Sequence, residues 1–307
     1  MSLKGRNFVD LADFDRAELR QILDTAHDLK QKQKQGEPHK LLKGKSLAMI
    51  FMKSSTRTRV SFEVGMTQLG GHALFLQPSG TQLGRGETIG DTALVLSRYC
   101  DVIMARVFGH DEVIELAKYA TVPVINGLSD LLHPCQIMAD MQTIEEHKGK
   151  LEGLKITYVG DSNNVSNSIM RGCTIMGMDV TIGSPRGYTP SDKIMKKATA
   201  LSKRYDTKLE VLNDPSKAVK GADVIYTDTF FSMGQEKSKE KEDALMPFQV
   251  NKALVGKAKD DAIVMHCLPA HRDEELTSEV MDGPHSVVFD QAENRLHAQK
   301  AILTLIV

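Results

Sequence analysis

Short apolar runs rich in β-branched residues alternate along this chain with segments whose apolar positions recur at the helical period. The apolar runs predict strands at residues 47–52, 72–76, 102–106, 122–126, 155–159, 179–182, 209–212, 224–227, 263–267 and 287–290. The periodic segments predict helices at residues 16–32, 60–69, 113–119, 136–147, 166–176 and 191–205. Such alternation is typical of α/β proteins whose parallel sheets are covered by helices on both faces.

The length of 307 residues predicts two domains. We expect two doubly wound parallel-sheet domains, formed by residues 1–148 and 149–291, with a join near Lys148-Gly149-Lys150. A final helix at residues 292–307 is expected to pack back on the first domain. The charged segment at residues 236–243 is interpreted as a mobile loop, and an inert solvated loop fits its composition equally well.

Composition narrows the class of protein. The chain has 39 Lys and Arg residues and 40 Asp and Glu residues, so its net charge is −1. It therefore lacks the excess of basic residues that is typical of a nucleic-acid-binding protein. Four cysteines, at positions 100, 135, 173 and 267, are too scattered for a disulfide framework. No apolar run approaches the ~18 residues of a membrane helix, and the first residues lack an apolar signal region. We therefore expect a soluble protein of the reducing cytoplasm with no membrane partner.

The densest cluster of candidate binding groups follows the first predicted strand. The segment Ser54-Ser55-Thr56-Arg57-Thr58-Arg59 brings four hydroxyls and two guanidinium groups to a strand-to-helix turn. A helix N-terminus presents unpaired backbone N–H groups and a partial positive charge. Hydroxyls and arginines added there make a site for a phosphate-sized anion. A hydroxyl cap with solvated arginines is the alternative, but this density of groups favours anion binding.

Other unusual polar residues also follow predicted strands. They are Arg106 and the segments 132–136, 228–234, 266–272 and 293–295. In open α/β sheets, ligands bind outside the carboxyl ends of the strands, so these residues are candidates for one or more sites. His133 can donate to a developing oxyanion and Gln136 can pair with an amide-like group, although a lone histidine there is equally well a helix cap.

Several other sites are excluded by spacing. His133, Cys135, His266 and Cys267 lack the paired spacing of a zinc site, so no metal is expected. The Gly44-Lys45-Ser46 segment lacks the earlier glycine of a P-loop and precedes its strand. Residues 160–164 lack the G-x-G-x-x-G fingerprint of a dehydrogenase, and their two asparagines suit a polar, uncharged ligand better than a pyrophosphate.

The cysteines divide by their surroundings. Cys100 and Cys173 lie in apolar periodic segments and are expected in the core. Cys267, at a strand end, is the candidate reactive or ligand-contacting thiol.

Four motifs together resemble the ornithine carbamoyltransferase family over essentially the whole chain. They are S-T-R-T-R at 55–59, H-P-C-Q at 133–136, D-x-x-x-S-M-G at 228–234 and H-C-L-P at 266–269. The first two are shared with aspartate carbamoyltransferases, whereas the last two are specific to the ornithine branch. One departure is Asp273, where family members often have glycine.

The resemblance implies a carbamoyl-phosphate domain, an ornithine domain and an active site in the cleft between them. The phosphate would be held by Ser55, Thr56, Arg57 and Thr58, and Arg295 would complete this anion pocket. Arg106 would bridge the phosphate and the carbonyl oxygen, and His133 would polarise the carbonyl. The carbamoyl amine would be bound by Gln136 together with the backbone of Cys267 and Leu268. Asn164, Asp228, Ser232 and Met233 would hold ornithine, and Gln82 would reach a neighbouring subunit's site in a homotrimer or an assembly of trimers.

The implied reaction is carbamoyl transfer from carbamoyl phosphate to L-ornithine, with Arg106, His133 and Cys267 as catalytic residues and no cofactor. Cys267 is a candidate for lowering the cost of a neutral amine or accepting its proton. A putrescine or other amino-acceptor carbamoyltransferase and a non-catalytic anion-binding homologue are the alternatives. The sequence leaves open whether citrulline is made or broken down.

Overall fold

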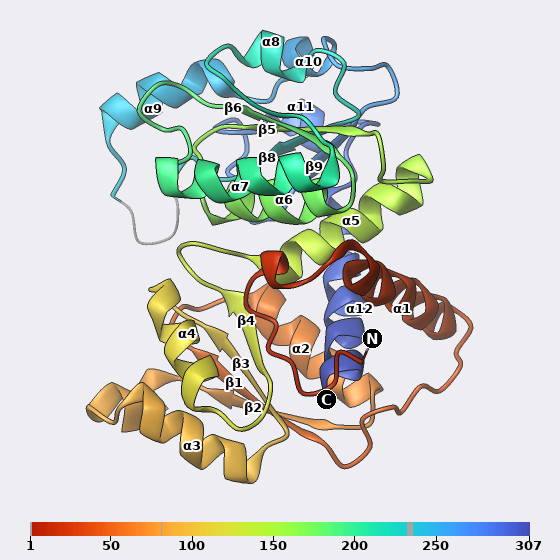
Figure 1. Cartoon of the computed structure of the whole chain (residues 1–307). Coiled ribbons are helices and arrows are strands. Elements are labelled where there is room, and N and C mark those ends of the chain that lie inside the picture. The colour runs from red at the N-terminus through yellow and green to blue at the C-terminus, as the bar shows by residue number, and fades with distance from the viewer. Residues whose placement is uncertain (1, 81, 232–235) are drawn as a thin grey trace. The chain divides into compact units, whose positions relative to one another are not determined.

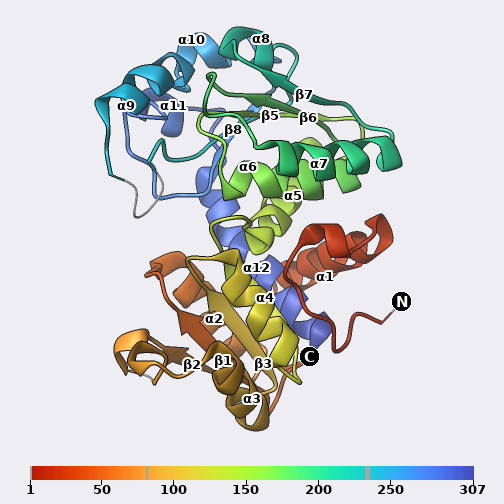
Figure 2. The same cartoon turned by 60° about the vertical axis from the view of Figure 1, so that its left-hand side comes forward.

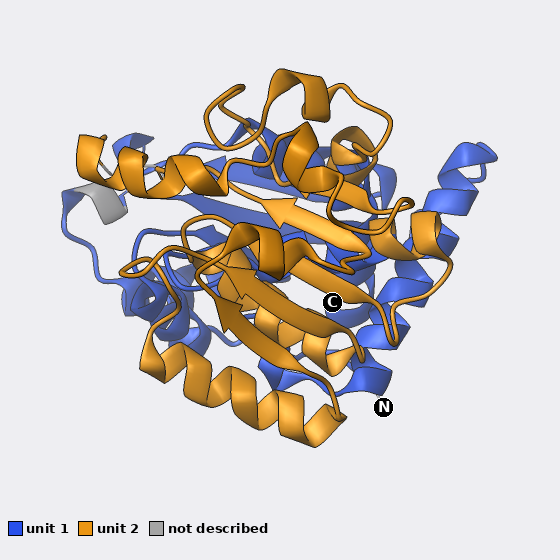
Figure 3. Ribbon diagram, turned by 90° about the horizontal axis from the view of Figure 1, so that it is seen from above, with its two compact units in different colours: residues 1–142, 293–307 blue, residues 143–292 orange. Residues whose placement is uncertain are grey.

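We describe a computed structural model of the chain, covering residues 2–80, 82–231 and 236–307. The chain divides into two compact units (Figure 3). Unit 1 comprises Met1–Gln142 and Glu293–Val307, and unit 2 comprises Thr143–Ala292. The division falls inside helices α5 (Pro134–Lys148) and α12 (Val288–Ile306), not at their ends.

Unit 1 contains a parallel sheet in the order β2-β1-β3-β4. Its strands are β1 (Ser46–Phe51), β2 (His72–Leu76), β3 (Val102–Arg106) and β4 (Val124–Leu128). Every residue of β3 is buried, and so is all of β1 after Ser46, because helices cover both faces of the central strands. β2 is the half-exposed edge strand.

The helices of unit 1 are α1 (Arg16–Lys34), α2 (Thr56–Gln68), α3 (Ile89–Tyr99), α4 (His110–Tyr119), the first part of α5 and the part of α12 from Glu293 onwards. On one face, Ala48, Ile50, Ile103 and Ala105 form a core cluster with apolar residues of α3 and α4, and Figure 1 shows these two helices on the same side of the sheet. Short 3-10 turns occupy Leu11–Asp13, Pro78–Gly80 and Gln82–Arg85.

Unit 2 contains a second parallel sheet in the order β7-β6-β5-β8-β9. Its strands are β5 (Lys155–Val159), β6 (Asp179–Gly183), β7 (Leu209–Leu212), β8 (Val224–Thr227) and β9 (Ile263–His266). Its remaining helices are α6 (Asn164–Ile175), α7 (Asp192–Tyr205), α8 (Pro215–Val219), α9 (Lys239–Leu245), α10 (Lys252–Val255) and α11 (Ser278–Met281), with a 3-10 turn at Met246–Phe248. Figures 1 and 2 show α6 and α7 on one face and α8 and α10 on the other.

The predicted fold class, two doubly wound parallel-sheet domains, is confirmed in its architecture. In each sheet the chain runs first in one direction and then in the other from a central strand, so each has a switch point. The switch point lies between β1 and β3 in unit 1 and between β5 and β8 in unit 2. Each switch point is where a ligand is expected, outside the carboxyl ends of the strands.

Three expectations about individual elements were wrong. Residues 287–290 are not a strand, because pairing with β9 ends after a single bridge at Ser286 and α12 begins at Val288. The segment 236–243 is not wholly a loop, since α9 begins at Lys239, capped by Ser238. Helix α3 and the short helices α8, α10 and α11 were not predicted at all.

Asp273, the departure from the family pattern, has a left-handed backbone with φ of 69°. Glycine adopts this conformation freely, and aspartate tolerates it better than most residues. Its carboxylate accepts hydrogen bonds from the backbone N–H and the hydroxyl of Ser278, 2.8 and 3.1 Å away. Asp273 therefore has a local structural role at the start of α11.

No helix within the described ranges is long and apolar enough to cross a membrane.

Candidate active site

The switch point of unit 1 brings together the end of β1, the start of α2 and the end of β3. Ser55 is the N-cap of α2, and its hydroxyl accepts a hydrogen bond from the backbone N–H of Thr58 at 3.2 Å. The Ser55 hydroxyl also donates to the Thr58 hydroxyl at 3.2 Å. The expected strand-to-helix turn is therefore present, and its hydroxyls lie at the positive end of a helix.

Two guanidinium groups converge on the buried hydroxyl of Thr58. Arg106, the last residue of β3, donates to Thr58 Oγ1 at 3.4 Å, and Arg295, from α12, donates to the same oxygen at 3.1 Å. Thr58 is fully buried, and the two arginines are 7% and 3% exposed. A neutral hydroxyl cannot balance two cations, whereas an oxyanion can accept from both. This arrangement suits a small anion.

His133, directly before α5, and Gln136, in the first turn of α5, lie beside these arginines. His133 is 4% exposed, and burial, together with the charges of Arg295 and Arg106, holds its pKa well below the usual value. The imidazole is therefore neutral near pH 7 and keeps one N–H that can donate to a carbonyl oxygen. Gln136 is also buried, and its amide oxygen accepts from Arg295 at 2.6 Å.

The remaining residues expected on this side are more exposed. Arg57 is half-buried and Thr56 is exposed at the start of α2. Arg59, in contrast, pairs with Glu63 at 3.1 Å and stacks on the ring of Phe75, 3.7 Å from its centroid. This geometry gives Arg59 a structural role. Gln82 lies exposed on a 3-10 turn.

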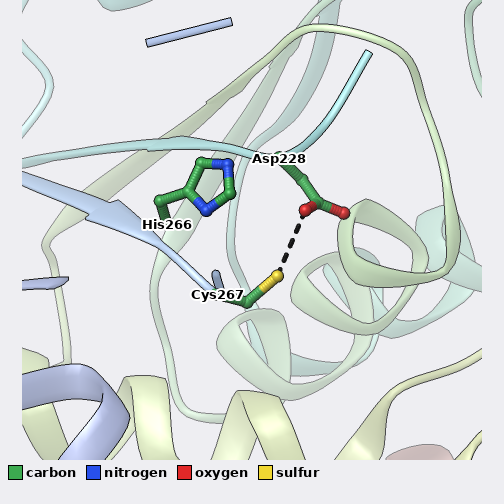
Figure 4. A group of neighbouring side chains, drawn as sticks. All are labelled: Asp228, His266 and Cys267. Atoms are coloured by element: carbon green, nitrogen blue, oxygen red, sulfur yellow. Dashed lines mark hydrogen bonds between the residues drawn. The ribbon is translucent and has the colours of Figure 1, made fainter. Parts of the chain in front are cut away.

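The switch point of unit 2 is organised around Asp228, which follows β8. One carboxylate oxygen accepts from the side-chain N–H of Asn163 at 2.7 Å, and the other accepts from the thiol of Cys267 at 3.2 Å (Figure 4). Asn163 caps α6, and Cys267 follows β9. Asp228 is 8% exposed, whereas Cys267 is half-buried. A buried carboxylate beside a thiol suits a cationic ligand.

The turn that bears Cys267 is held by His266 and Glu275. The backbone N–H of Leu268 donates to Nδ1 of His266 at 2.8 Å, so Nε2 carries the proton and donates to Glu275 at 3.1 Å. His266 and Glu275 are fully buried. Leu268 has a left-handed backbone with φ of 58°, which this network maintains.

The contacts of His266 also indicate whether this site suits a metal ion. Asp228, His266 and Cys267 lie close enough to be compared with a metal-ligand set (Figure 4). Both ring nitrogens of His266 are already engaged, one by Leu268 and one by Glu275. A metal would have to displace one of these contacts, so the arrangement does not favour one.

The structure brings most of the predicted residues to the two switch points, but not all. Asn163 contacts Asp228, while Asn164, which is predicted to bind ornithine, is half-buried in the first turn of α6. Ser232 and Met233 lie outside the described residues. Cys100 and Cys173 are buried as expected, and all four cysteines are free thiols.

Sequence reasoning missed Asp140, Asp161 and Lys241. Asp140 accepts from the Gln136 amide at 2.7 Å. Asp161 follows β5 and pairs with Lys241 of α9 at 2.6 Å, which ties α9 to this edge of the sheet. The four-residue spacing of Gln136 and Asp140 on one helix was the available signal for the first contact.

Together, the fold and these two groups define a two-domain α/β protein with one group of residues suited to a phosphate-sized anion in unit 1 and another suited to a cationic ligand in unit 2. The carbamoyl-P binding domain of aspartate/ornithine carbamoyltransferases matches residues 6–146, and their Asp/Orn binding domain matches residues 152–306. The chain therefore belongs to the aspartate/ornithine carbamoyltransferase family, which confirms the resemblance seen in the motifs.

Relatives match over the full length. Ornithine carbamoyltransferase of Thermococcus kodakarensis is 59% identical, with 100% of this chain and 98% of the relative covered. The ornithine carbamoyltransferase of Pyrococcus furiosus that is named anabolic is 58% identical, with the same coverage. A solved structure of ornithine carbamoyltransferase from Pyrococcus furiosus has a TM-score of 0.97 at 58% identity and covers 100% of this chain and 98% of its own.

Proposed function

We propose that this protein is an ornithine carbamoyltransferase, which transfers the carbamoyl group of carbamoyl phosphate to the δ-amino group of L-ornithine and releases L-citrulline and phosphate. The observation that carries this function is the full-length match, at 58–59% identity, to ornithine carbamoyltransferases. The name of the Pyrococcus furiosus relative supports the biosynthetic direction, towards arginine.

Unit 1 holds carbamoyl phosphate in this proposal. Ser55, Thr56, Arg57 and Thr58 bind the phosphate at the start of α2, with Arg106 and Arg295 completing the anion pocket. The convergence of both guanidiniums on Thr58 supports this role, because an incoming phosphate can accept from both. Gln136 binds the carbamoyl amine, and the backbone of Cys267 and Leu268 is the predicted contribution of unit 2.

Unit 2 holds ornithine. Asp228 accepts from the α-amino group, while Asn164, Ser232 and Met233 remain predictions from the family resemblance. The contact of Asn163 with Asp228 supports adding Asn163 to this group, as the residue that orients the carboxylate.

The proposed reaction needs a neutral amine and a stabilised leaving group. A free alkylammonium with a pKa of about 10.4 costs about 4–5 kcal/mol to deprotonate at pH 7. The neutral δ-amine attacks the carbonyl carbon while His133 and Arg106 donate to the carbonyl oxygen. The C–O bond to phosphate then breaks, the arginines bind the released phosphate, and the attacking nitrogen loses a proton. Cys267 is the candidate acceptor as a thiolate, after its own proton has passed to Asp228 along their hydrogen bond.

The assembly is proposed to be a homotrimer, or an assembly of trimers, in which Gln82 completes a neighbour's site. Exposed apolar residues on α2 and on the edge strand β2 support an interface there. Val60 and Val64 are 50% and 38% exposed, and Leu74 is 40% exposed. Exposed apolar patches of this kind mark association surfaces. We place the protein in the cytoplasm, in keeping with its free thiols.

A carbamoyl-transfer assay with four acceptors tests the function. Ornithine, putrescine, aspartate and acetylornithine are offered at equal concentration with carbamoyl phosphate, and the product is measured by mass spectrometry. Ornithine should give a much higher kcat/KM than the other three. Faster turnover of putrescine or aspartate would reassign the acceptor, and binding of carbamoyl phosphate without any transfer would point to a non-catalytic homologue.

A further inference from the structure

The side-chain amide of Gln136 is held at both ends inside unit 1. Its oxygen accepts from Nη1 of Arg295 at 2.6 Å, and its nitrogen donates to Oδ1 of Asp140 at 2.7 Å. Gln136 is 1% exposed, Asp140 is 0% exposed and Arg295 is 3% exposed. Gln136 and Asp140 lie four residues apart in α5, so they share one face of the helix.

These two contacts permit only one orientation of the amide. A guanidinium can only donate hydrogen bonds, and an ionised carboxylate can only accept them. Rotation of the amide by half a turn would place its N–H₂ against Arg295 and its oxygen against Asp140. Both hydrogen bonds would then be lost at a buried position, which is costly. The amide oxygen is therefore presented on the side of Arg295 and Thr58, where the anion site lies.

We propose that Asp140 is a positioning residue that makes the anion site of unit 1 selective for acyl phosphates bearing an NH₂ group. It does so by keeping the Gln136 oxygen, not its nitrogen, toward the donor substrate. An amide oxygen has two lone pairs, so it can accept from Arg295 and from a carbamoyl NH₂ at once. A methyl group in that position, as in acetyl phosphate, offers no hydrogen and leaves the second lone pair unmatched. This inference rests on the proposed use of carbamoyl phosphate.

Asp140 is needed in addition to Arg295 because Arg295 has a second task. Arg295 also donates to Thr58 and is proposed to bind the phosphate, so its contacts change when the substrate arrives. Asp140 is on the same helix as Gln136, and its contact with the amide nitrogen does not involve the substrate. It therefore continues to fix the amide while the anion occupies the guanidinium. Specificity of this kind arises from the difference in affinity between matched and unmatched ligands.

The test compares three stable ligands in calorimetry with the full-length protein. Phosphonoacetamide carries the NH₂ group, acetonylphosphonate replaces it by methyl, and inorganic phosphate lacks both. The wild type should prefer the amide over the ketone by about tenfold, the worth of one hydrogen bond. Asp140→Ala should reduce this preference to about twofold or less while phosphate affinity stays within about twofold, because phosphate does not contact the amide.

Two further variants of Asp140 and one double variant keep the test decisive. Asp140→Asn retains a side-chain oxygen that can accept from Gln136 and should keep most of the preference. Asp140→Ser is too short to reach Gln136 and should behave like Asp140→Ala, so it serves if the alanine variant does not fold, as judged by thermal unfolding. In a Gln136→Met background, Asp140→Ala should leave the ratio of the two affinities unchanged, since the group it positions is gone.

Two results would overturn the proposal. One is a folded Asp140→Ala or Asp140→Ser protein with the wild-type preference for the amide. The other is an equal loss of affinity for all three ligands, which would mean a structural role for Asp140. Failure of the wild type to carbamoylate ornithine would reject the proposed function instead, and the amide-to-ketone ratio would still report on Asp140.

Discussion

The hydroxyl of Thr58 receives hydrogen bonds from two arginines that are far apart in the sequence, one at the end of β3 and one in α12. The motif at residues 55–59 predicted an anion site at a strand-to-helix turn, and Ser55 proves to be the N-cap of the helix that follows. Alternate positions on a tight turn and the first helical turn cannot all face one ligand, which predicts that Arg57 binds the phosphate and that Arg59 is structural. The contacts support the second assignment, because Arg59 pairs with Glu63 and stacks on the ring of Phe75.

Arg57→Gln should abolish carbamoyl transfer. Removal of a desolvated charge from the phosphate site is expected to cost about 2–5 kcal/mol in carbamoyl-phosphate binding. Arg59→Gln is the matched control and should keep binding, because it removes a pair on the surface of α2 worth less than about 1 kcal/mol. Calorimetry with carbamoyl phosphate separates the two. Unchanged affinity in a folded Arg57→Gln protein would mean that the phosphate is held without this side chain.

The thiol of Cys267 donates to Asp228, so its replacement should act on the ornithine side. Cys267→Ser is expected to raise the KM for ornithine, lower kcat, or both, and to alter the pH–rate profile over about pH 6–10, which brackets free thiol and amine pKa values. The KM for carbamoyl phosphate should change less. Cys100→Ser, at a buried position in the core of unit 1, is the control for loss of a thiol. If Cys267→Ser shows the kinetic constants of the wild type across this pH range, the thiol contributes only to packing.

Single residues also show where sequence reasoning ends. The pair Asn163-Asn164 was recognised as polar and placed after a strand, but which asparagine faces Asp228 depends on where α6 begins. Asn163 is the N-cap, with its side-chain oxygen bound to the N–H groups of Val165 and Ser166, and this leaves its amide nitrogen for Asp228. A shift of one residue in the helix start reverses the assignment, and helix starts are hard to place that finely from sequence.

At the scale of elements, α12 shows what the apolar pattern could and could not predict. The run at residues 287–290 has the composition of a strand, but its pairing stops after the bridge at Ser286 and the chain turns into α12. Tertiary contacts decide this, not local preference. Lys300 of α12 is such a contact, since its ammonium donates to Gln33, Gln68 and His39 at 2.7, 2.8 and 3.0 Å and joins α12 to α1 and α2.

Burial lowers the pKa of Lys300 from 10.5 to about 8. A base whose pKa is lower in the folded protein binds fewer protons there than in the unfolded chain, so this residue makes stability rise with pH between about 8 and 10.5. The neighbouring His297 has its pKa lowered to about 3 by burial first and by Lys300 next, and it stays neutral over this range. The His39 ring donates from Nδ1 to the carbonyl of Glu37 and accepts a hydrogen bond from the Lys300 ammonium at Nε2.

Lys300→Met should therefore flatten the pH dependence of stability between pH 8 and about 10.5. The variant is also expected to be less stable at every pH, because Gln33 and Gln68 lose a donor. The informative quantity is the slope of the thermal midpoint against pH, measured relative to the wild type. Lys43→Met, at an exposed position, serves as the control. Equal slopes for wild type and Lys300→Met would show that the buried ammonium does not titrate in this range.

At the scale of the whole molecule, sheet topology determines where most of the candidate site residues lie. Alternating strands and helices predicted two parallel sheets, and the rule that ligands bind outside the carboxyl ends of strands made the polar residues at those ends the candidate site residues. The strand orders then bring the ends of β1 and β3 together in unit 1 and the ends of β5 and β8 in unit 2. The contact of Gln136 with Arg295 joins residues 159 positions apart, and sequence periodicity carries no information on such a pair. The proposed contribution of a second subunit cannot be read from the fold of one chain.

The last prediction concerns that contribution. Gln82 lies exposed on a 3-10 turn of unit 1, and the proposed trimer sends this turn into a neighbour's site through a head-to-tail contact. Gln82→Glu and Arg106→Ala should each be inactive alone. In a hybrid trimer, a site can combine the intact Arg106 of the first variant with the intact Gln82 of the second. Random one-to-one mixing should make about a quarter of the sites native, because each of the two choices has a probability of about one half in a closed ring.

The two variants are dissociated, mixed and reassembled, and native mass spectrometry verifies the hybrids before activity is measured. Activity near a quarter of the wild type would establish a shared site. The matched control mixes Arg106→Ala with His133→Ala, whose mutations fall in the same group of buried residues in unit 1. Every site in those hybrids keeps one defective pocket, so they should stay inactive. Verified hybrids of the first pair that are no more active than their parents would place Gln82 in its own chain's site or in none.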